Sequence, residues 1–301
     1  MAFSVNTNTG AMAALQSLNA TTKGLSTVQS RINTGLNVTS TKDDSATFAI
    51  AQNLRGDLGG LKAVSTSLSR AKSVTDVAVA GAEQISDVVN QMKTLAKQAS
   101  DEGISDDTRA AYNKDFTALR DQITTIVNSS EFNGTNLLKS GGGTVSALQS
   151  LSNKASGSGT YAPDSLTVAN QALDLPASGT ISSGAGFGML GQNSTLIAAS
   201  GTTPAEKAAD AKKMVDTLDK LGKDLSGKLS DLGSAARKID AQQTFTSKLE
   251  DTIEGGIGNL VDADLAKESA KLQALQVKQQ LGVQALSIAN QAPQTITSLF
   301  R

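Results

Sequence analysis

A segment that resembles a phosphate-binding loop is the first feature of the sequence that could do chemistry. Residues 222–228 (Gly-Lys-Asp-Leu-Ser-Gly-Lys) match the opening places of a P-loop, in which backbone amides and a lysine hold phosphate groups. The next place is Leu229 instead of the Ser or Thr that would bind magnesium. The segment also lies within an amphipathic helical pattern, not between a strand and a helix. We therefore interpret it as part of a helix.

A second glycine pattern, at residues 186–191, fits the GxGxxG sequence of dinucleotide-binding folds. That fold requires a strand before the glycines and a helix that opens at the last of them. The sequence around Gly191 indicates neither element. We expect a surface segment here and predict no cofactor.

Carboxylates stand close together at three places, where they could contact a cation weakly. The three pairs are Asp43-Asp44, Asp106-Asp107, and Asp262 with Asp264. A carboxylate at the start of a helix accepts hydrogen bonds from free backbone amides. Because the second and third pairs each follow glycine, both are predicted to cap the starts of helices. We predict no metal site at any of the three.

The sequence contains neither histidine nor cysteine. Their absence excludes serine–histidine and cysteine–histidine catalysis, disulfides and Cys/His zinc sites. No acid–base pair can be argued from the remaining residues, so we predict that the protein is not an enzyme. A net charge of −1 gives no basic footprint for nucleic acid. No apolar run approaches the roughly 20 residues of a membrane span, and no cleavable secretory signal is visible.

The positions of proline and glycine divide the chain into helical ends and an irregular centre. Pro163, Pro176 and Pro204 fall in or beside a glycine-rich region, residues 141–204, where long helices are disfavoured. The glycines at 255, 256 and 258 are expected to end the helix that follows Pro204. Two short alternating stretches, Thr144–Leu151 and Ser165–Leu175, are predicted strands or hairpins.

Three apolar seams with helical spacing indicate long helices. The first steps in threes and fours over Leu61–Ala99, with Thr75 as its polar interruption. The others cover Tyr112–Ile126 and Met214–Ile253. None of the three can bury its stripe alone, so we expect them to pack as an antiparallel bundle. The predicted fold class is mainly α: a long-helix, coiled-coil bundle of N- and C-terminal regions with a small β or irregular central insertion.

The two ends of the chain carry thin but matching amphipathic patterns. Residues 1–42 contain no acidic residue, whereas residues 262–268 hold Asp262, Asp264 and Glu268. A hairpin-shaped molecule would bring these ends together, and we predict that they pair. The apolar positions of the two patterns are Leu15, Leu18, Leu25, Val28 and Ile32 near the start, and Leu265, Leu272, Leu275, Leu281, Leu286 and Ile288 near the end.

A row of glutamines follows one helical face near the C-terminus. It consists of Gln273, Gln276, Gln280, Gln284 and Gln291. Spacing alone is typical of a solvated helix face. The alternative is a neutral polar wall that faces an aqueous channel, and both interpretations stay open at this point.

Two sets of motifs resemble those of bacterial flagellin, the subunit of the flagellar filament. The N-terminal set comprises Ile-Asn-Thr-Gly-Leu-Asn-Val at 32–38, Lys-Asp-Asp-Ser-Ala at 42–46 and Phe-Asn-Gly at 132–134. The C-terminal set comprises Asp-Ala-Asp-Leu-Ala-Lys-Glu-Ser-Ala at 262–270, Leu-Ser-Ile-Ala-Asn-Gln at 286–291 and Ser-Leu-Phe-Arg at 298–301. The resemblance covers about 1–140 and 205–301, and leaves the centre unmatched.

The resemblance implies a layered extracellular filament, assembled from copies of the chain as an open helical polymer that serves motility. Residues 1–42 and 258–301 would pair as its inner core, where Leu299 and Phe300 join the apolar positions given above and the glutamines line the channel. Residues 43–140 and 205–257 would form a surrounding helical bundle, and residues 141–204 a variable exposed region with a β-hairpin. The resemblance also implies type III export, with an export chaperone, cap proteins and hook-junction proteins as partners.

The resemblance extends to a segment that many flagellins present to the innate immune receptor, Toll-like receptor five. In this chain it includes Gln91, Lys93, Thr94 and Leu95. The family pattern has Arg in place of Gln91 and Glu in place of Thr94, so this chain lacks two charged contacts. We expect weak or no receptor activation.

Two alternatives to a filament subunit stay open on the sequence. A junction or cap protein of the same assembly would share the terminal patterns. An adhesive or glycan-binding role could reside in residues 141–204, alone or together with filament formation.

Overall fold

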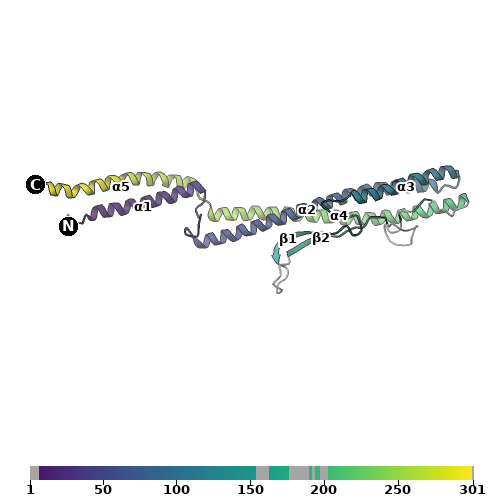
Figure 1. Cartoon of the computed structure of the whole chain (residues 1–301), viewed down its shortest axis with the longest axis horizontal. Coiled ribbons are helices and arrows are strands. Elements are labelled where there is room, and N and C mark those ends of the chain that lie inside the picture. Colours follow the sequence, from purple (N-terminus) through teal and green to yellow (C-terminus); the bar gives the residue numbers. More distant parts are fainter. Residues whose placement is uncertain (1–6, 154–162, 176–189, 192–193, 197–202, 300–301) are drawn as a thin grey trace. The chain divides into compact units, whose positions relative to one another are not determined.

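The computed structural model describes residues 7–153, 163–175, 190–191, 194–196 and 203–299 (Figure 1), with side chains up to Gln291 except those of residues 152 and 153. Its helices are α1 (Thr9–Thr34), α2 (Ser45–Ala99), α3 (Asp106–Ser129), α4 (Pro204–Val261) and α5 (Leu265–Leu299). Its strands are β1 (Val145–Asn153) and β2 (Pro163–Val168), which form a two-stranded antiparallel sheet. The predicted fold class is confirmed.

The chain forms two compact units. The terminal unit comprises residues 1–59 and 251–301, and the central unit comprises residues 60–250. Because α2 and α4 each extend from one set of residues into the other, the boundaries lie within helices.

The predicted seam over Leu61–Ala99 is buried at every position in the central unit. It packs with buried residues of α3 and α4, among them Phe116, Ile123 and Leu225. Thr75 tolerates full burial because its hydroxyl donates to the carbonyl oxygen of Ala71 at 2.8 Å, which satisfies the polar atom within its own helix. The seam therefore forms a helical core, as predicted.

The turn between α2 and α3 is organised by a fully buried arginine that sequence analysis did not single out. Arg109 donates to the carbonyl oxygens of Ala99 and Asp101, at 3.1 and 2.7 Å, and to the carboxylate of Asp106 at 3.2 Å. The first two bonds satisfy carbonyl oxygens at the last residue of α2 and just beyond it, where no helical amide is available. Arg109 thus ties the end of α2 to the first turn of α3.

The β-hairpin is fastened to the helices by side chains that bond its backbone. Ser67 of α2 accepts a hydrogen bond from the amide of Leu148, and Gln242 of α4 donates to the carbonyl oxygen of Gln149. The second strand ends at Val168 and does not run to Leu175 as predicted. The residues that follow bond elsewhere, since the amides of Gln171 and Leu173 donate to the carbonyl oxygens of Leu137 and Leu138.

A tight turn at residues 132–135 closes the segment after α3. Phe132 and Thr135 exchange two backbone hydrogen bonds, at 3.0 and 3.1 Å. The residues between them, Asn133 and Gly134, have φ of 50° and 79°. Positive φ at both central positions defines a type I′ turn, for which Asn-Gly is the preferred sequence.

Helix α4 passes through the glycines that were expected to end it. It continues past Gly255 and Gly256 to Val261, so that prediction is wrong. A helical glycine costs about 1 kcal/mol relative to alanine, and packing can outweigh this cost. Ile257 and Val261 supply such packing, because they are buried in a cluster with Val38 and Ala51 of the terminal unit.

Within the terminal unit, α1 and α5 lie side by side in opposite directions, so that the start of α1 lies beside the C-terminal half of α5 (Figure 1). The side-chain amide of Asn8 donates to the carbonyl oxygen of Ala289 at 2.7 Å. The loops at the opposite end are tied by backbone bonds, since Ala263 donates to Gly35 and Asn37 donates to Val261. Helices α1 and α5 therefore pack against each other within the terminal unit.

Among the described residues, no helix combines the length and the apolar character needed to cross a bilayer.

Candidate functional site

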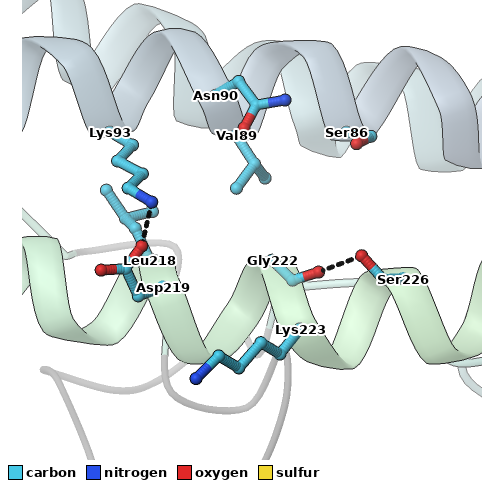
Figure 2. Close-up of a pocket in the computed structure, with 9 residues that line it drawn as sticks. All are labelled: Ser86, Val89, Asn90, Lys93, Leu218, Asp219, Gly222, Lys223 and Ser226. Carbon is cyan, nitrogen blue, oxygen red and sulfur yellow. Dashed lines mark hydrogen bonds and ion pairs between the residues drawn. The ribbon is translucent and has the colours of Figure 1, made fainter.

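The P-loop-like segment lies within helix α4, which confirms its interpretation as part of a helix. Figure 2 shows it along a groove between α2 and α4, where Ser226 Oγ donates to the carbonyl oxygen of Gly222 at 2.8 Å. Lys93 of α2 forms an ion pair with Asp219 across this groove. The backbone amides of a helix interior are already bonded within the helix, so they cannot cradle a phosphate. The GxGxxG pattern at 186–191 lies mostly outside the described residues.

Two of the carboxylate pairs supply helix caps. Asp44 accepts hydrogen bonds from the amides of Ala46 and Thr47 at the start of α2, and Asp264 accepts one from the amide of Lys267 at the start of α5. The Thr47 hydroxyl, which also donates to Asp44, is the main cause that lowers the pKa of this carboxyl. Capping by Asp264 was predicted and is confirmed.

The remaining pair, Asp106 and Asp107, does not cap its helix. The residue that caps α3 is Ser105, whose side chain accepts from the amide of Thr108, so the prediction of a capping role for Asp106 and Asp107 is wrong. Asp106 instead bonds Lys207 at 2.9 Å and Arg109 at 3.2 Å. The hydrogen bond from Lys207 is the largest cause that lowers the pKa of Asp106. No group of ligating side chains suited to a metal ion occurs in the described part of the chain.

The α1–α5 pair buries only part of the predicted apolar positions. Leu25 and Val28 of α1 are buried, at 7% and 6% exposure. Close approach is possible where glycine faces leucine, at Gly24 opposite Leu275 and at Gly282 opposite Leu18. The half-buried members of the predicted set are Leu18, Ile32, Leu272, Leu275 and Leu286.

The buried carboxylate of Glu268 carries the charge complementarity between α1 and α5. Glu268, in the first turn of α5, is only 5% exposed. Its Oε1 accepts from Lys271 at 2.6 Å and lies 3.7 Å from Arg31 Nη1 of α1. The acidic start of α5 thus meets a basic residue from the last turn of α1.

The rest of the predicted apolar set faces outward. Leu15, Leu265, Leu281 and Ile288 are exposed, with Ile288 at 69%. Met12, Val277 and Val283 are exposed on the same two helices. The side chains of Leu299 and Phe300 lie outside the described residues. We call Met12, Leu15, Leu265, Val277, Leu281, Val283 and Ile288 together the exposed terminal face, which on α5 covers two sides of the helix. Exposed apolar side chains concentrated on one helical pair are typical of an interaction surface.

The glutamine row is exposed throughout. Gln273, Gln276, Gln280, Gln284 and Gln291 are all exposed on α5. The residues of α5 that approach α1, such as Leu275 and Gly282, lie on a different side of the helix. The glutamines therefore take no part in the α1–α5 pairing.

The predicted receptor-facing segment divides between two sides of α2. Gln91, Thr94 and Leu95 line a groove against α3, opposite Asp115 and Leu119. Lys93 points to α4, where it pairs with Asp219, and does not share that groove. The helical period explains this division, because positions 91, 94 and 95 share a face that excludes 93.

Two family models match the chain in the order expected from its terminal motifs. The bacterial flagellin N-terminal helical region matches residues 5–142, and the bacterial flagellin C-terminal helical region matches residues 215–300. The chain belongs to the bacterial flagellin family.

Curated relatives match this flagellin along its whole length. Flagellin FljM of Caulobacter vibrioides is 43% identical over 298 residues, which is 99% of this chain and 98% of that protein. Flagellin FljK of the same organism is also 43% identical with the same coverage. Flagellin C of Rhizobium meliloti is 33% identical over 99% of both proteins.

These matches establish what this flagellin does. It is a structural subunit that polymerises with copies of itself into the extracellular filament of the bacterial flagellum, and it is not an enzyme. They favour the filament subunit over a junction or cap protein. The adhesive alternative concerns residues 141–204, many of which lie outside the described residues, and it stays a hypothesis.

Proposed function

We propose that the exposed terminal face is the surface through which this flagellin contacts neighbouring copies in the inner layer of the filament. The observation that carries the proposal is its concentration of apolar side chains. Of the eleven large hydrophobic side chains that are exposed in the described part of the chain, seven lie on α1 and α5. Burial of such a side chain contributes about 1.5–3 kcal/mol, so several of them support a stable contact.

The predicted assembly core then has two roles. Leu25, Val28 and their half-buried neighbours hold α1 against α5 within one subunit. Leu281 and Ile288 are left for neighbouring subunits. An open helical polymer requires such surfaces, because its contacts repeat from subunit to subunit without closing.

We further propose that the glutamine row lines the central channel of the filament. Its neutral, hydrogen-bonding side chains are exposed and point away from the α1 partner. A neutral polar wall would not retain charged segments of a passing chain. In the proposed layers, residues 1–42 and 258–301 are innermost, residues 43–140 and 205–257 surround them, and residues 141–204 face outward.

The proposed partners before and during assembly are an export chaperone, the cap and the hook-junction proteins. The exposed terminal face supports a requirement for such partners, since an uncovered apolar surface promotes aggregation. Weak or no activation of Toll-like receptor five is proposed from the uncharged Gln91 and Thr94 beside Leu95. A reporter-cell assay with purified filament protein tests this, and robust signalling would contradict it.

The central proposal is tested by a charge placed on the exposed terminal face. Ile288→Asp removes apolar surface and puts a carboxylate into the proposed contact, so seeded polymerisation is expected to fail at concentrations where the unaltered chain forms filaments. Ser287→Asp is the matched control, because it adds the same charge at the adjacent exposed position without removing apolar area. Electron microscopy and sedimentation measure filament yield. Normal filaments from Ile288→Asp would overturn the assignment of this face.

A further inference from the structure

The type I′ turn at residues 132–135 contains the chain's single Asn-Gly sequence, Asn133-Gly134. Both residues are exposed to solvent. Among the described residues, neither the side-chain amide of Asn133 nor the amide of Gly134 has a hydrogen-bond partner. The turn therefore combines a free carboxamide, a free backbone amide next to it and a glycine that offers no side-chain hindrance.

These groups are the reactants of asparagine deamidation. The nitrogen of Gly134 attacks Cγ of Asn133, a bond forms between these atoms, and the bond from Cγ to Nδ2 breaks. The amide proton of Gly134 and the Nδ2 amide group leave together as ammonia, and a five-membered succinimide remains. Solvent water then opens the ring at either carbonyl, which yields aspartate or, with the main chain rerouted through Cγ, isoaspartate. The reaction needs no oxidant, reductant or enzyme.

The closed turn opposes the first of these steps. In a type I′ turn the first central residue has ψ of about +30°, which directs the following nitrogen away from the side chain. Ring closure requires rotation about the Cα–C bond of Asn133. That rotation breaks the pair of backbone hydrogen bonds between Phe132 and Thr135. Opening of the turn must therefore precede the reaction.

We propose that Asn133 of this flagellin is a site of spontaneous deamidation whose rate is set by opening of the 132–135 turn. Both products add a negative charge beside Glu131 on the exposed surface. Aspartate is one of the few residues that adopt the left-handed conformation readily, so it keeps the turn. Isoaspartate adds an atom to the main chain, and the two-residue loop no longer fits.

This reaction matters in an extracellular polymer, because cytoplasmic enzymes cannot replace or repair subunits outside the cell. Old segments of filament accumulate the modified turn, and young segments near the growing end lack it. The fraction of modified subunits thus records the age of a segment.

The test compares the folded full-length chain with the same chain unfolded in urea, both at 37 °C in mildly alkaline buffer. Peptide mapping by mass spectrometry follows a gain of about 1 Da at residue 133, and protein isoaspartate methyltransferase labels the isoaspartate fraction. The folded chain is expected to gain this mass, at a rate at least about tenfold below that of the unfolded chain, because two hydrogen bonds of the usual strength hold the turn closed.

An internal control is Asn128-Ser129 at the end of α3, a second reactive sequence whose backbone lies within a helix. No gain is expected there in the folded chain. The Asn133→Gln variant assigns the signal, because its longer side chain cannot form the five-membered ring. Equal rates in folded and unfolded chains would overturn control by the turn. Absence of the gain from the folded chain after complete conversion in urea would overturn Asn133 as a site in the native protein.

Discussion

Leu225 of α4 and Leu281 of α5 are the same residue in two long helices, yet Leu225 is fully buried and Leu281 is 57% exposed. The difference extends to the regions around them. The seam of the central unit is covered at every position, whereas the α1–α5 pair leaves much of its apolar surface open. Two paired helices each bury only the side that faces the partner. At least a third helix is needed to enclose a core. The core of the central unit is thus complete within one chain, and we propose that the terminal pair is completed by other chains.

Removal of residues 1–40 should have the largest effect, because it is expected to abolish assembly without unfolding the central unit. Without α1, Leu272, Leu275 and Leu286 lose their partner, and polymerisation is expected to be abolished. The central unit should stay folded, because its buried cluster contains no residue of the deleted segment. Electron microscopy checks filament formation, and circular dichroism during heating checks folding. A normal filament from the truncated chain would refute the distinction between the two regions.

Matched leucine substitutions should separate stability from assembly. Leu225→Ala leaves a cavity in the central core and is expected to lower the free energy of unfolding by about 2–5 kcal/mol. Leu281→Ala should change the stability of the monomer by less than about 0.5 kcal/mol, because its side chain is already exposed. It should instead raise the protein concentration needed for polymerisation. Denaturant titration and sedimentation of filaments measure the two effects, and equal destabilisation by both variants would contradict this view.

Two glycine substitutions should sharpen the picture of packing within the central unit. A methyl group at Gly81 would overlap Ser130 Oγ and lie 2.8 Å from Leu138 Cδ1, both buried. Gly81→Ala is therefore expected to cost about 1–3 kcal/mol. Gly222→Ala meets open space in the interior of α4 and should add about 0.5–1 kcal/mol of stability. Thermal unfolding compares the two variants. A stabilising Gly81→Ala would contradict this view, because it would show that the segment with Ser130 and Leu138 can shift away from α2 without cost.

The smallest expected effect concerns the ion pair at the start of α3. The pKa of Asp106 is lowered below its usual 3.8, chiefly by the hydrogen bond from Lys207. A lowered folded-state pKa means that the contribution to stability is present above the unfolded pKa and is lost as pH falls through the folded value. Denaturant titrations at neutral and strongly acidic pH should show a slightly smaller loss of stability for Asp106→Asn than for the unaltered chain. An identical pH dependence in both proteins would show that this pair contributes nothing.

The sequence predicted the helical core well because heptad spacing reports directly on which side chains a partner helix can cover. It placed Thr75 in the seam correctly. It failed at Gly255 and Gly256, because the local cost of glycine says nothing of the packing that Val261 finds at a distance in the sequence. It also missed Arg109, since burial of a full charge depends on carbonyl oxygens that the turn at Ala99 and Asp101 presents only once folded.

The exposed terminal face was only partly predictable. The apolar positions of α1 and α5 could be enumerated, but not their division into buried and exposed members. That division depends on where glycine permits close approach, at Gly24 and Gly282. In the same way, the sequence placed Lys93 with Gln91, Thr94 and Leu95, although the helical period directs Lys93 to Asp219.

The hydrogen bond from Asn8 to Ala289 joins positions 281 residues apart. During synthesis, α1 therefore leaves the ribosome long before its partner helix α5 has been made. At about 5–20 residues per second, α1 is complete for on the order of tens of seconds before α5 exists. During that interval Leu25 and Val28 have nothing to cover them, and a helix of this length is marginal by itself. Because of this order of synthesis, the first helix of the chain is the last to pack against its partner.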